Sequence, residues 1–494
     1  MILSKLKNYI NNNKYWFTVG LILLLSLCCC AYFIHSEYII YTLWAILIIP
    51  VIYLLIFYTE KMFYLTCFLI PFSRELREFI PTTTVSFSIP SEPMLAGIML
   101  LFLLIVIMQD WYPKILAQHK ISLVFYLYIF WLLITSITST MPLVSFKFLI
   151  AKLCFIVPAY FFFSALLHKD LHKASTFFLC YATSLAVVVC ITTYKHIMLA
   201  DVRKVAYWVM SPYYNDHTAY GAVLAFFVPV LALLPFVKSL PIWKKKLSVI
   251  LLVPIILGLY LSFSRAAWLS VACSLGLYIF IRLRIKFKYL LLALIVFGGV
   301  FFAFQDMLIH QLHKNSTDAE AGDLTAQIQS ITNISTDASN VERLNRWSSA
   351  IDMFKEKPFL GFGPGTFQFQ YAPYQNANLK TVITTNAGDG GNAHSEYLGA
   401  LSESGLFGML IIIVLVFGVI IIGIKTIWVT DVNAIKYYAT MAVLALTSYF
   451  IHGILNNFLD TDKLAIPVFG AMAIIVACNV RQKIHMNRNR EEVE

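Results

Sequence analysis

Fourteen mostly apolar segments, separated by short polar breaks, recur along this chain of 494 residues. A helix that crosses a bilayer needs about 20 such residues in succession. The segments lie near residues 15–34, 38–58, 62–72, 93–109, 121–138, 146–167, 175–195, 217–237, 247–262, 266–281, 288–305, 395–424, 436–456 and 464–480. Inside a bilayer, a helix satisfies its own backbone hydrogen bonds. The pattern therefore predicts an all-α polytopic membrane protein with about 12–14 transmembrane helices, of which the third is short.

Charged residues are few and unevenly distributed. They make up 13% of the chain, about half of what soluble domains carry, so a water-soluble enzyme is excluded. Positively charged residues of short loops are retained on the cytoplasmic side of a membrane. If both termini are cytoplasmic, most Lys and Arg residues of the loops fall on that side. We therefore attribute the net charge of +11 to topology rather than to nucleic-acid binding.

One long polar loop, residues 306–394, interrupts the spans and is expected on the outer side. It contains an amphipathic pattern over Val341–Lys357, whose apolar stripe is Leu344, Trp347, Ile351 and Phe354. Gly361, Gly363 and Gly365 follow and are typical of a tight turn. We expect three regions: residues 1–305 with transmembrane helices 1–11, residues 306–394 as the long loop with its helix, and residues 395–494 with the last transmembrane helices and a short cytoplasmic tail.

Positively charged residues expected on the outer side are candidates for function. Arg265 lies where two predicted spans meet with almost no loop. A charge held there is costly without an anionic partner, although such an arginine can also extend to lipid headgroups. Arg203 and Lys204 occupy a short outer loop, although Lys and Arg are usually found in the cytoplasmic loops of membrane proteins. Guanidinium is well suited to phosphate, while pairing of Arg203 with Asp201 is the alternative.

Polar residues at predicted helix starts complete the set. We expect Asn215 or Asp216 to cap the helix that follows them. His394 stands where the long loop enters a span, and the helix N-terminus disfavours imidazolium. A neutral imidazole there can accept a proton near pH 7, or it can be a purely structural hydrogen-bonding group. Arg343 and Arg346 precede it in the same loop.

Arginines beside a neutral base suit one kind of chemistry. They can stabilise a lipid-linked phosphate or diphosphate as it leaves, while the base activates an incoming hydroxyl. The outer segments contain no His-rich cluster for a divalent cation. We therefore expect charge neutralisation by arginines, with no metal and no other cofactor.

The motifs occur in a characteristic order. They are the Arg203 loop, Asn215 before a span, Ser264-Arg265-x-x-Trp268, Arg343 and Arg346-Trp347, Pro358-x-x-Gly-x-Gly-x-Gly-x-Phe367, His394-Ser-x-Tyr-Leu398 and Glu403-x-Gly405-x-x-Gly408. This order, over roughly residues 195–410, resembles the O-antigen ligase and polymerase superfamily of bacterial membrane glycosyltransferases. The chain departs from the family pattern at 214–217, where Tyr-Asn-Asp-His replaces a commoner Asn-Pro-Asn, and the acid-rich part of the loop at 306–340 has no recognised motif.

The resemblance implies a GT-C-like fold in the bacterial inner membrane, with the active site at the periplasmic face. It implies metal-independent, inverting transfer of a glycan from undecaprenyl diphosphate to a hydroxyl of a glycolipid acceptor, lipid A-core, in lipopolysaccharide biosynthesis. By analogy His394 is the general base, and Arg203 and Arg265 contact the diphosphate. We expect the other substrate-binding residues to be Lys204, Arg343, Arg346, Asn392 and Glu403.

Other functions fit parts of the pattern. A polymerase of the same superfamily would extend a lipid-linked glycan and is the main alternative to a ligase. A protein O-oligosaccharyltransferase is less favoured. A polysaccharide transporter would carry ionisable residues and broken helices within its spans, for which Lys152 and Pro158 are modest indications.

Overall fold

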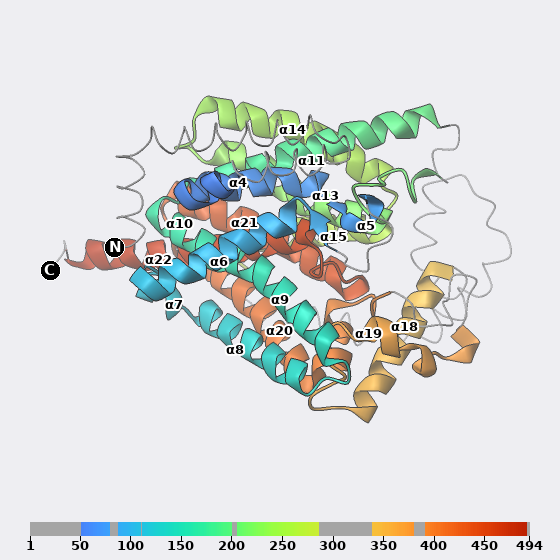
Figure 1. Cartoon of the computed structure of the whole chain (residues 1–494). Coiled ribbons are helices and arrows are strands. Elements are labelled where there is room, and N and C mark those ends of the chain that lie inside the picture. The colour runs from blue at the N-terminus through green and yellow to red at the C-terminus, as the bar shows by residue number, and fades with distance from the viewer. Residues whose placement is uncertain are drawn as a thin grey trace, which may run out of the picture.

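The computed structural model describes residues 51–79, 87–109, 111–199, 205–285, 338–379 and 391–491. These residues form a bundle of roughly parallel and antiparallel helices (Figure 1). The predicted spans 15–34 and 288–305, and most of 38–58, lie outside the described residues. So do Arg203 and Lys204, and the part of the long loop before residue 338.

In the described part of the chain, nine helices are long and apolar enough to cross a membrane. They are α6 (Ser91–Gln109), α8 (Lys120–Ile137), the continuous run α9–η3–α10 (Pro142–Lys169), α11 (Lys173–Met198), α13 with η4 (His217–Phe236), α15 (Arg265–Arg282), α20 (Glu396–Val429), α21 (Asn433–Leu455) and α22 (Asp462–Glu491). Each coincides with a predicted span. The prediction of an all-α polytopic membrane protein is thus confirmed.

Two further predicted spans differ from these nine. Helix α14 (Ile242–Leu261) has 20 residues, but its first turns carry Lys244, Lys245 and Lys246. The predicted span 62–72 is an 11-residue helix, α4 (Thr59–Leu69), followed by the 3-10 turn η2 (Ile70–Phe72). At 1.5 Å per residue α4 is about 16 Å long, well short of the roughly 30 Å hydrocarbon core. Helix α4 therefore cannot cross a bilayer on its own.

The core of the bundle lies around α21 and α22, whose side chains are mostly buried. The lateral surface is apolar, with exposed residues such as Ile250 and Val253 on α14 and Phe417 on α20. In water such a surface would be unstable, whereas lipid covers it at no cost. The described residues are therefore arranged as expected for a protein embedded in a bilayer.

Several short elements lie at the end of the bundle that carries the candidate site. Strand β1 (Arg74–Glu75) pairs antiparallel with β2 (Ser88–Ile89). The long loop contributes α18, α19, η5 and η6, with bounds Ala338–Glu356, Phe367–Gln370, Ala372–Tyr374 and Ala377–Leu379. The single-turn helix α5 (Leu76–Phe79) follows β1 at this end, whereas α7 (Lys114–Ala117) lies at the opposite end, near the end of α22 (Figure 1). Helices α18 and α19 lie at the right of Figure 1.

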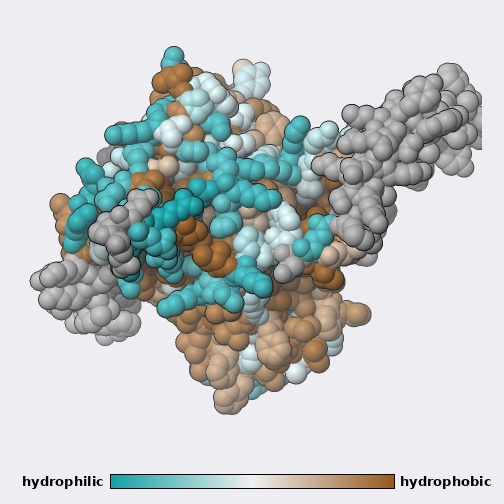
Figure 2. Space-filling view, turned by 90° about the vertical axis from the view of Figure 1, so that its left-hand side faces the viewer, coloured by the Kyte–Doolittle hydropathy of each residue, from teal (hydrophilic) through white to brown (hydrophobic). Residues whose placement is uncertain are grey.

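The two ends of the bundle differ in composition. One end of the bundle lies near α18. It holds the first residues of α13, α15, α20 and α22 and the last residues of α14 and α21. The opposite end carries basic residues, including Lys169 at the end of α10, Arg282 at the end of α15, and Arg488 on α22. Figure 2 shows that opposite end, where hydrophilic residues gather over the centre and hydrophobic ones predominate below.

Candidate functional site

Helix α18 (Ala338–Glu356) forms where the sequence predicts an amphipathic helix, but it does not bury its apolar stripe. Its buried residues are Glu342, Asn345, Arg346, Ser349, Ala350 and Met353. Ile351, from the predicted apolar stripe, is 40% exposed. Helix α18 packs against α20 and the segment that follows the glycine turn. The inner face of α18 is therefore formed mainly by polar and small side chains, and it packs against the start of α20.

Arg346 is buried on that inner face and is held from three sides. Its Nε donates to Oε1 of Glu342 at 2.8 Å, forming an ion pair along the helix. Its guanidinium lies over the ring of Tyr371, 4.2 Å from the centroid. Its Nη1 lies 3.5 Å from the carbonyl oxygen of Asn392. Arg346 therefore connects α18 to the segment just before His394.

His394 lies at the entry to α20 with a fixed main chain. Its φ is +49°, a left-handed conformation that costs energy for any residue except glycine. Its N–H donates to Oδ1 of Asn392 at 3.0 Å, and its carbonyl accepts from Nε1 of Trp347 at 3.2 Å. Ser395 caps α20 by accepting from the N–H of Leu398. The protein thus holds a partly buried imidazole at one position.

The electrostatic surroundings keep this imidazole neutral. Burial is the largest cause that lowers the pKa of His394 to about 4, and the positive charges of Arg343 and Arg346 lower it further. The carboxylate of Asp216 acts in the opposite direction. A neutral imidazole is therefore present near pH 7, and burial rather than the helix terminus is the main reason.

Arg265 begins α15, at the tight turn that the sequence predicts. Helix α14 ends at Leu261, and Nε1 of Trp268 donates to the carbonyl of Leu259 at 3.0 Å, closing the turn. The first N–H groups of a helix carry partial positive charge. Arg265 adds a full charge at this point, and its charge and that of Arg343 both act on His217. Such an arrangement can bind an anionic group.

Asp216, next to His217, is the cap that the sequence predicts for α13. Its Oδ1 accepts from the N–H groups of Thr218 and Ala219, both at 2.7 Å. Asp216 also acts electrostatically on His394, and so links the start of α13 to the start of α20. Asn215, by contrast, is exposed, and its Nδ2 donates to Oε1 of Glu75 at 3.3 Å.

Glu403 lies in the first part of α20 and supports the glycine turn. Its Oε1 accepts from the N–H of Phe367 at 2.9 Å, and its carbonyl accepts from Gly363 at 2.8 Å. A Cβ at Gly363, whose φ is +116°, would lie 1.9 Å from Oγ of Ser139, so only glycine fits. The structure therefore places the Glu403 carboxylate on the main chain of the turn, not with the arginines around His394.

Helix α20 is kinked directly after Glu403. Gly405 has φ +68° and ψ −172°, which is not helical. A Cβ at Gly405 would lie 2.1 Å from the carbonyl oxygen of Phe359. The N–H of Leu406, which the kink frees, donates to the carbonyl of Pro358 at 2.9 Å. The glycine turn thus fits into the kink and separates the short first segment of α20 from the long span that follows.

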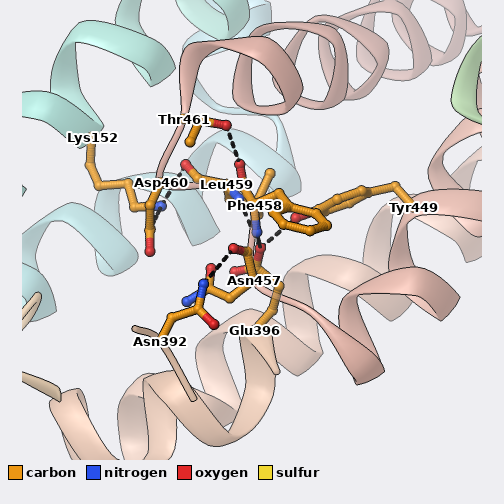
Figure 3. A network of polar contacts seen from close by, with 9 residues as sticks. All are labelled: Lys152, Asn392, Glu396, Tyr449, Asn457, Phe458, Leu459, Asp460 and Thr461. Carbon is orange, nitrogen blue, oxygen red and sulfur yellow. Dashed lines mark hydrogen bonds and ion pairs between the residues drawn. The ribbon is translucent and has the colours of Figure 1, made fainter. Parts of the chain in front are cut away.

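A network of polar contacts fixes the loop between α21 and α22 beside this first segment (Figure 3). Oε1 of Glu396 accepts from the N–H groups of Phe458 and Leu459, both at 2.9 Å, and from the hydroxyl of Tyr449. Nδ2 of Asn392 donates to the carbonyl of Asn457 at 3.0 Å. The side chains on either side of His394 in the sequence therefore hold the same loop.

Lys152 of α9 (Pro142–Ile156) holds that loop from the other side (Figure 3). Its Nζ lies 2.7 Å from Oδ1 of Asp460 and donates to the carbonyl of Leu459 at 2.8 Å. Lys152 is buried, whereas Asp460 is partly exposed. This contact accounts for the charge inside a predicted span that, from the sequence, suggested a transporter.

Several residues of this site escape sequence reasoning. Glu396 is two residues from His394. Its carboxylate at the start of an apolar span was the one indication in the sequence that it has a structural or functional role. Lys152 and Asp460 are about 300 residues apart, and nothing in the sequence pairs them. In the described part of the chain, no group of three or more His, Cys, Asp or Glu side chains is placed to hold a metal ion.

Replacing Glu396 by alanine is expected to lower the Tm of the purified protein. The change leaves the N–H groups of Phe458 and Leu459 without their acceptor, at about 1–3 kcal/mol for each buried group. Glu396→Gln keeps an acceptor oxygen and should lose less. Thermal unfolding in detergent measures the effect, with Glu491→Ala at the exposed end of α22 as the control. Equal Tm values for Glu396→Ala and the unmodified protein would contradict this role.

Comparison with known proteins supports the resemblance that the motifs indicate. Residues 250–413, about a third of the chain, match the family model described as O-antigen ligase. The matched range contains Arg265, Arg343, Arg346, Asn392 and His394. No curated protein matches the chain significantly. The chain is thus similar to the O-antigen ligases over the part that carries the described candidate residues.

Proposed function

We propose that this protein is a membrane glycosyltransferase of the O-antigen ligase type. It transfers a glycan from undecaprenyl diphosphate to a hydroxyl of lipid A-core. The observation that carries the proposal is the placement of His394: Asn392 and Trp347 fix its main chain at the start of α20, and its imidazole lies within the field of Arg343 and Arg346. A neutral base beside fixed positive charges suits a reaction in which a proton is accepted and a diphosphate leaves.

The proposed reaction forms one bond and breaks another. The acceptor oxygen bonds to the anomeric carbon of the donor while its proton passes to His394. The bond from that carbon to the diphosphate oxygen breaks, and the lipid diphosphate leaves with the electron pair. Attack opposite to the leaving group inverts the anomeric centre. Arg265 and Arg343 stabilise the departing negative charge, so the transfer needs no metal ion.

The remaining candidate residues receive different roles in this proposal. Arg203 and Lys204, which lie outside the described residues, are proposed to contact the donor as the family resemblance implies. Arg346 and Asn392 position the main chain of His394 through their contacts with this segment. Glu403 supports the glycine turn through Phe367. These three act through the fold more than through direct contact with substrate.

We also propose the orientation that the charges favour. Basic residues such as Lys169, Arg282 and Arg488 lie at the end of the bundle opposite His394. Positively charged loops are retained in the cytoplasm. The protein therefore lies in the bacterial inner membrane with His394 at the periplasmic face, where residues 306–394 form the periplasmic loop.

Transfer by the purified protein is the direct test. The full chain in nanodiscs is given an undecaprenyl-diphosphate-linked glycan and lipopolysaccharide that lacks the polymer. We expect release of undecaprenyl diphosphate together with glycan attached to the lipopolysaccharide, both read by mass spectrometry. If the lipid-linked glycan stays intact and only changes leaflet, the protein is a transporter and the proposal is wrong.

A gene deletion separates a ligase from a polymerase. Loss of all polymer from lipid A-core, with polymer accumulating on the lipid carrier, is the result expected for a ligase. A single repeat that is still attached to lipid A-core would instead identify a polymerase. Gel separation of the extracted glycans shows which of these occurs.

A further inference from the structure

A polar cavity of about 210 Å³ lies beside Asn392. Its wall is formed by strands β1 and β2, by the segment before α13, and by the loop between α21 and α22. Apart from Asn392, the described residues of the wall lie outside the range matched by the family model. Neither Arg265 nor Arg343 contributes to the described wall. The cavity is therefore distinct from Arg265 and Arg343, which are proposed to stabilise the leaving diphosphate.

The wall of the cavity is rich in hydrogen-bond acceptors. It carries the carboxyl groups of Glu75, Asp216, Asp460 and Asp462 and the amides of Asn215, Asn392 and Asn457. Its basic residues, Arg74 and Lys463, are engaged: Arg74 with Glu78 at 2.7 Å, and Lys463 with the carbonyl of Ser73 at 2.9 Å. Such a wall suits a neutral group that donates many hydroxyl hydrogens better than it suits a diphosphate.

Two of these acceptors lack a donor. Asp462 is fully buried, and its Oδ2 accepts from Ser73 at 3.0 Å and from Ser91. Its Oδ1 has no hydrogen-bond partner among the residues that the structure describes, nor has Oδ1 of Asn457. Buried acceptors are nearly always satisfied in folded proteins. Both atoms are buried and belong to residues of the wall, so the wall contains acceptors that the described protein groups do not use.

Aromatic rings complete the wall. Tyr213 and Phe458 line the cavity and are partly buried. Ring faces of this kind cover apolar C–H surfaces, while nearby polar groups set orientation. A sugar ring presents both kinds of surface, hydroxyls around its edge and C–H groups on its faces. The cavity therefore matches a saccharide in both its polar and its apolar parts.

Asn392 joins the cavity to the proposed base. It lines the cavity, donates to the carbonyl of Asn457 at 3.0 Å, and accepts from the N–H of His394 at 3.0 Å. Asp216 also lines the cavity and acts electrostatically on His394. The cavity is therefore linked through Asn392 to the main chain of His394 and through Asp216 to the electrostatics of its imidazole.

We infer that this cavity binds the acceptor saccharide and presents its hydroxyl to His394. The inference rests on the proposed function, because it gives that reaction the site of its second substrate. The hydroxyl proton passes to His394 as the oxygen bonds to the anomeric carbon, and the lipid diphosphate leaves with the electrons of the broken bond. The proposed diphosphate contacts Arg265 and Arg343 lie outside the described wall, so the two substrates bind in separate places.

Glu75→Gln and Asn215→Ala test the inference, because both residues line the cavity at its accessible side. Polymer-free lipopolysaccharide and a lipid-linked repeat serve in turn as acceptors, with full-length protein in nanodiscs. We expect the acceptor KM to rise about tenfold, as for loss of one hydrogen bond to a charged group, with the donor KM unchanged. Asp352→Asn, an exposed carboxylate of α18 in contact with Lys355, is the matched control.

The outcomes separate the inference from the proposed function. If the unmodified protein transfers glycan and both KM values of the variants equal those of the control, the cavity is not a saccharide site. A rise in the donor KM alone would place the donor sugar there, which also overturns the inference. If the unmodified protein releases no lipid diphosphate, the proposed function itself fails. Unchanged Tm values show that the variants are folded.

Discussion

His394→Ala is expected to reduce glycan transfer by about 10²–10⁴-fold, the usual contribution of a positioned general base. Without the imidazole, the acceptor hydroxyl has no group to accept its proton as it attacks. Binding of the donor should change little, because the arginines remain. The measurement is kcat for release of undecaprenyl diphosphate, with His485→Ala on the exposed end of α22 as the control.

The pH dependence of the same reaction follows from the electrostatics. Burial and the nearby arginines lower the pKa of His394 to about 4. A base acts in its unprotonated form, so kcat/KM should be constant from neutral pH down to about pH 5 and fall only below it. A fall centred near pH 6.5, the ordinary value for histidine, would show that the imidazole is solvated and not held as described. Full activity of His394→Ala would remove it as the base.

Arg265→Ala is expected to lower kcat/KM by about 10²–10³-fold, as for removal of one group that stabilises a developing charge. Arg265 stands at the N-terminus of α15, where its charge adds to that of the helix dipole. Arg265→Lys should restore only part of the rate, because an ammonium group cannot contact two phosphate oxygens as a planar guanidinium does. Release of undecaprenyl diphosphate again provides the measurement.

Helix α15 offers its own control for this prediction. Arg282 ends the same helix at the opposite end of the bundle, so Arg282→Ala removes an equal charge far from His394. We expect nearly unchanged transfer for Arg282→Ala. An equal loss for both variants would mean that the helix requires its charges for stability or insertion. In that case Arg265 would have no special role with the diphosphate.

The spans and the local turns were predictable from the sequence. A long apolar run in a bilayer forms a helix, because a helix satisfies all of its own backbone hydrogen bonds. The nine spans of the described residues coincide with predicted ones. The tight turn before Arg265 and the cap at Asp216 also follow local rules, because a few adjacent residues determine each. The run at 62–72 was the exception. It forms a short helix that ends in a 3-10 turn at Pro71, and its hydropathy does not distinguish this arrangement from a span.

The contacts that organise the candidate site were not predictable in the same way. The buried face of α18 carries Glu342 and Arg346, because the surface on which it packs is polar, so the apolar periodicity predicted the helix but not its packing face. Lys152 and Asp460 meet only after the bundle assembles. The cavity likewise combines β1 with the loop after α21. Hydropathy and motif spacing carry no information about contacts between residues so distant in the chain.

The kink at Gly405 has a consequence for how the protein tolerates different membranes. After the kink, α20 continues from Leu406 to Val429, which at 1.5 Å per residue is about 36 Å and exceeds the roughly 30 Å hydrocarbon core, and such helices tilt when the bilayer becomes thinner. The segment that carries His394 lies beyond the kink and is fixed by Glu396 and the glycine turn rather than by the long span. We therefore expect a change in bilayer thickness to tilt the span with little displacement of the segment that carries His394.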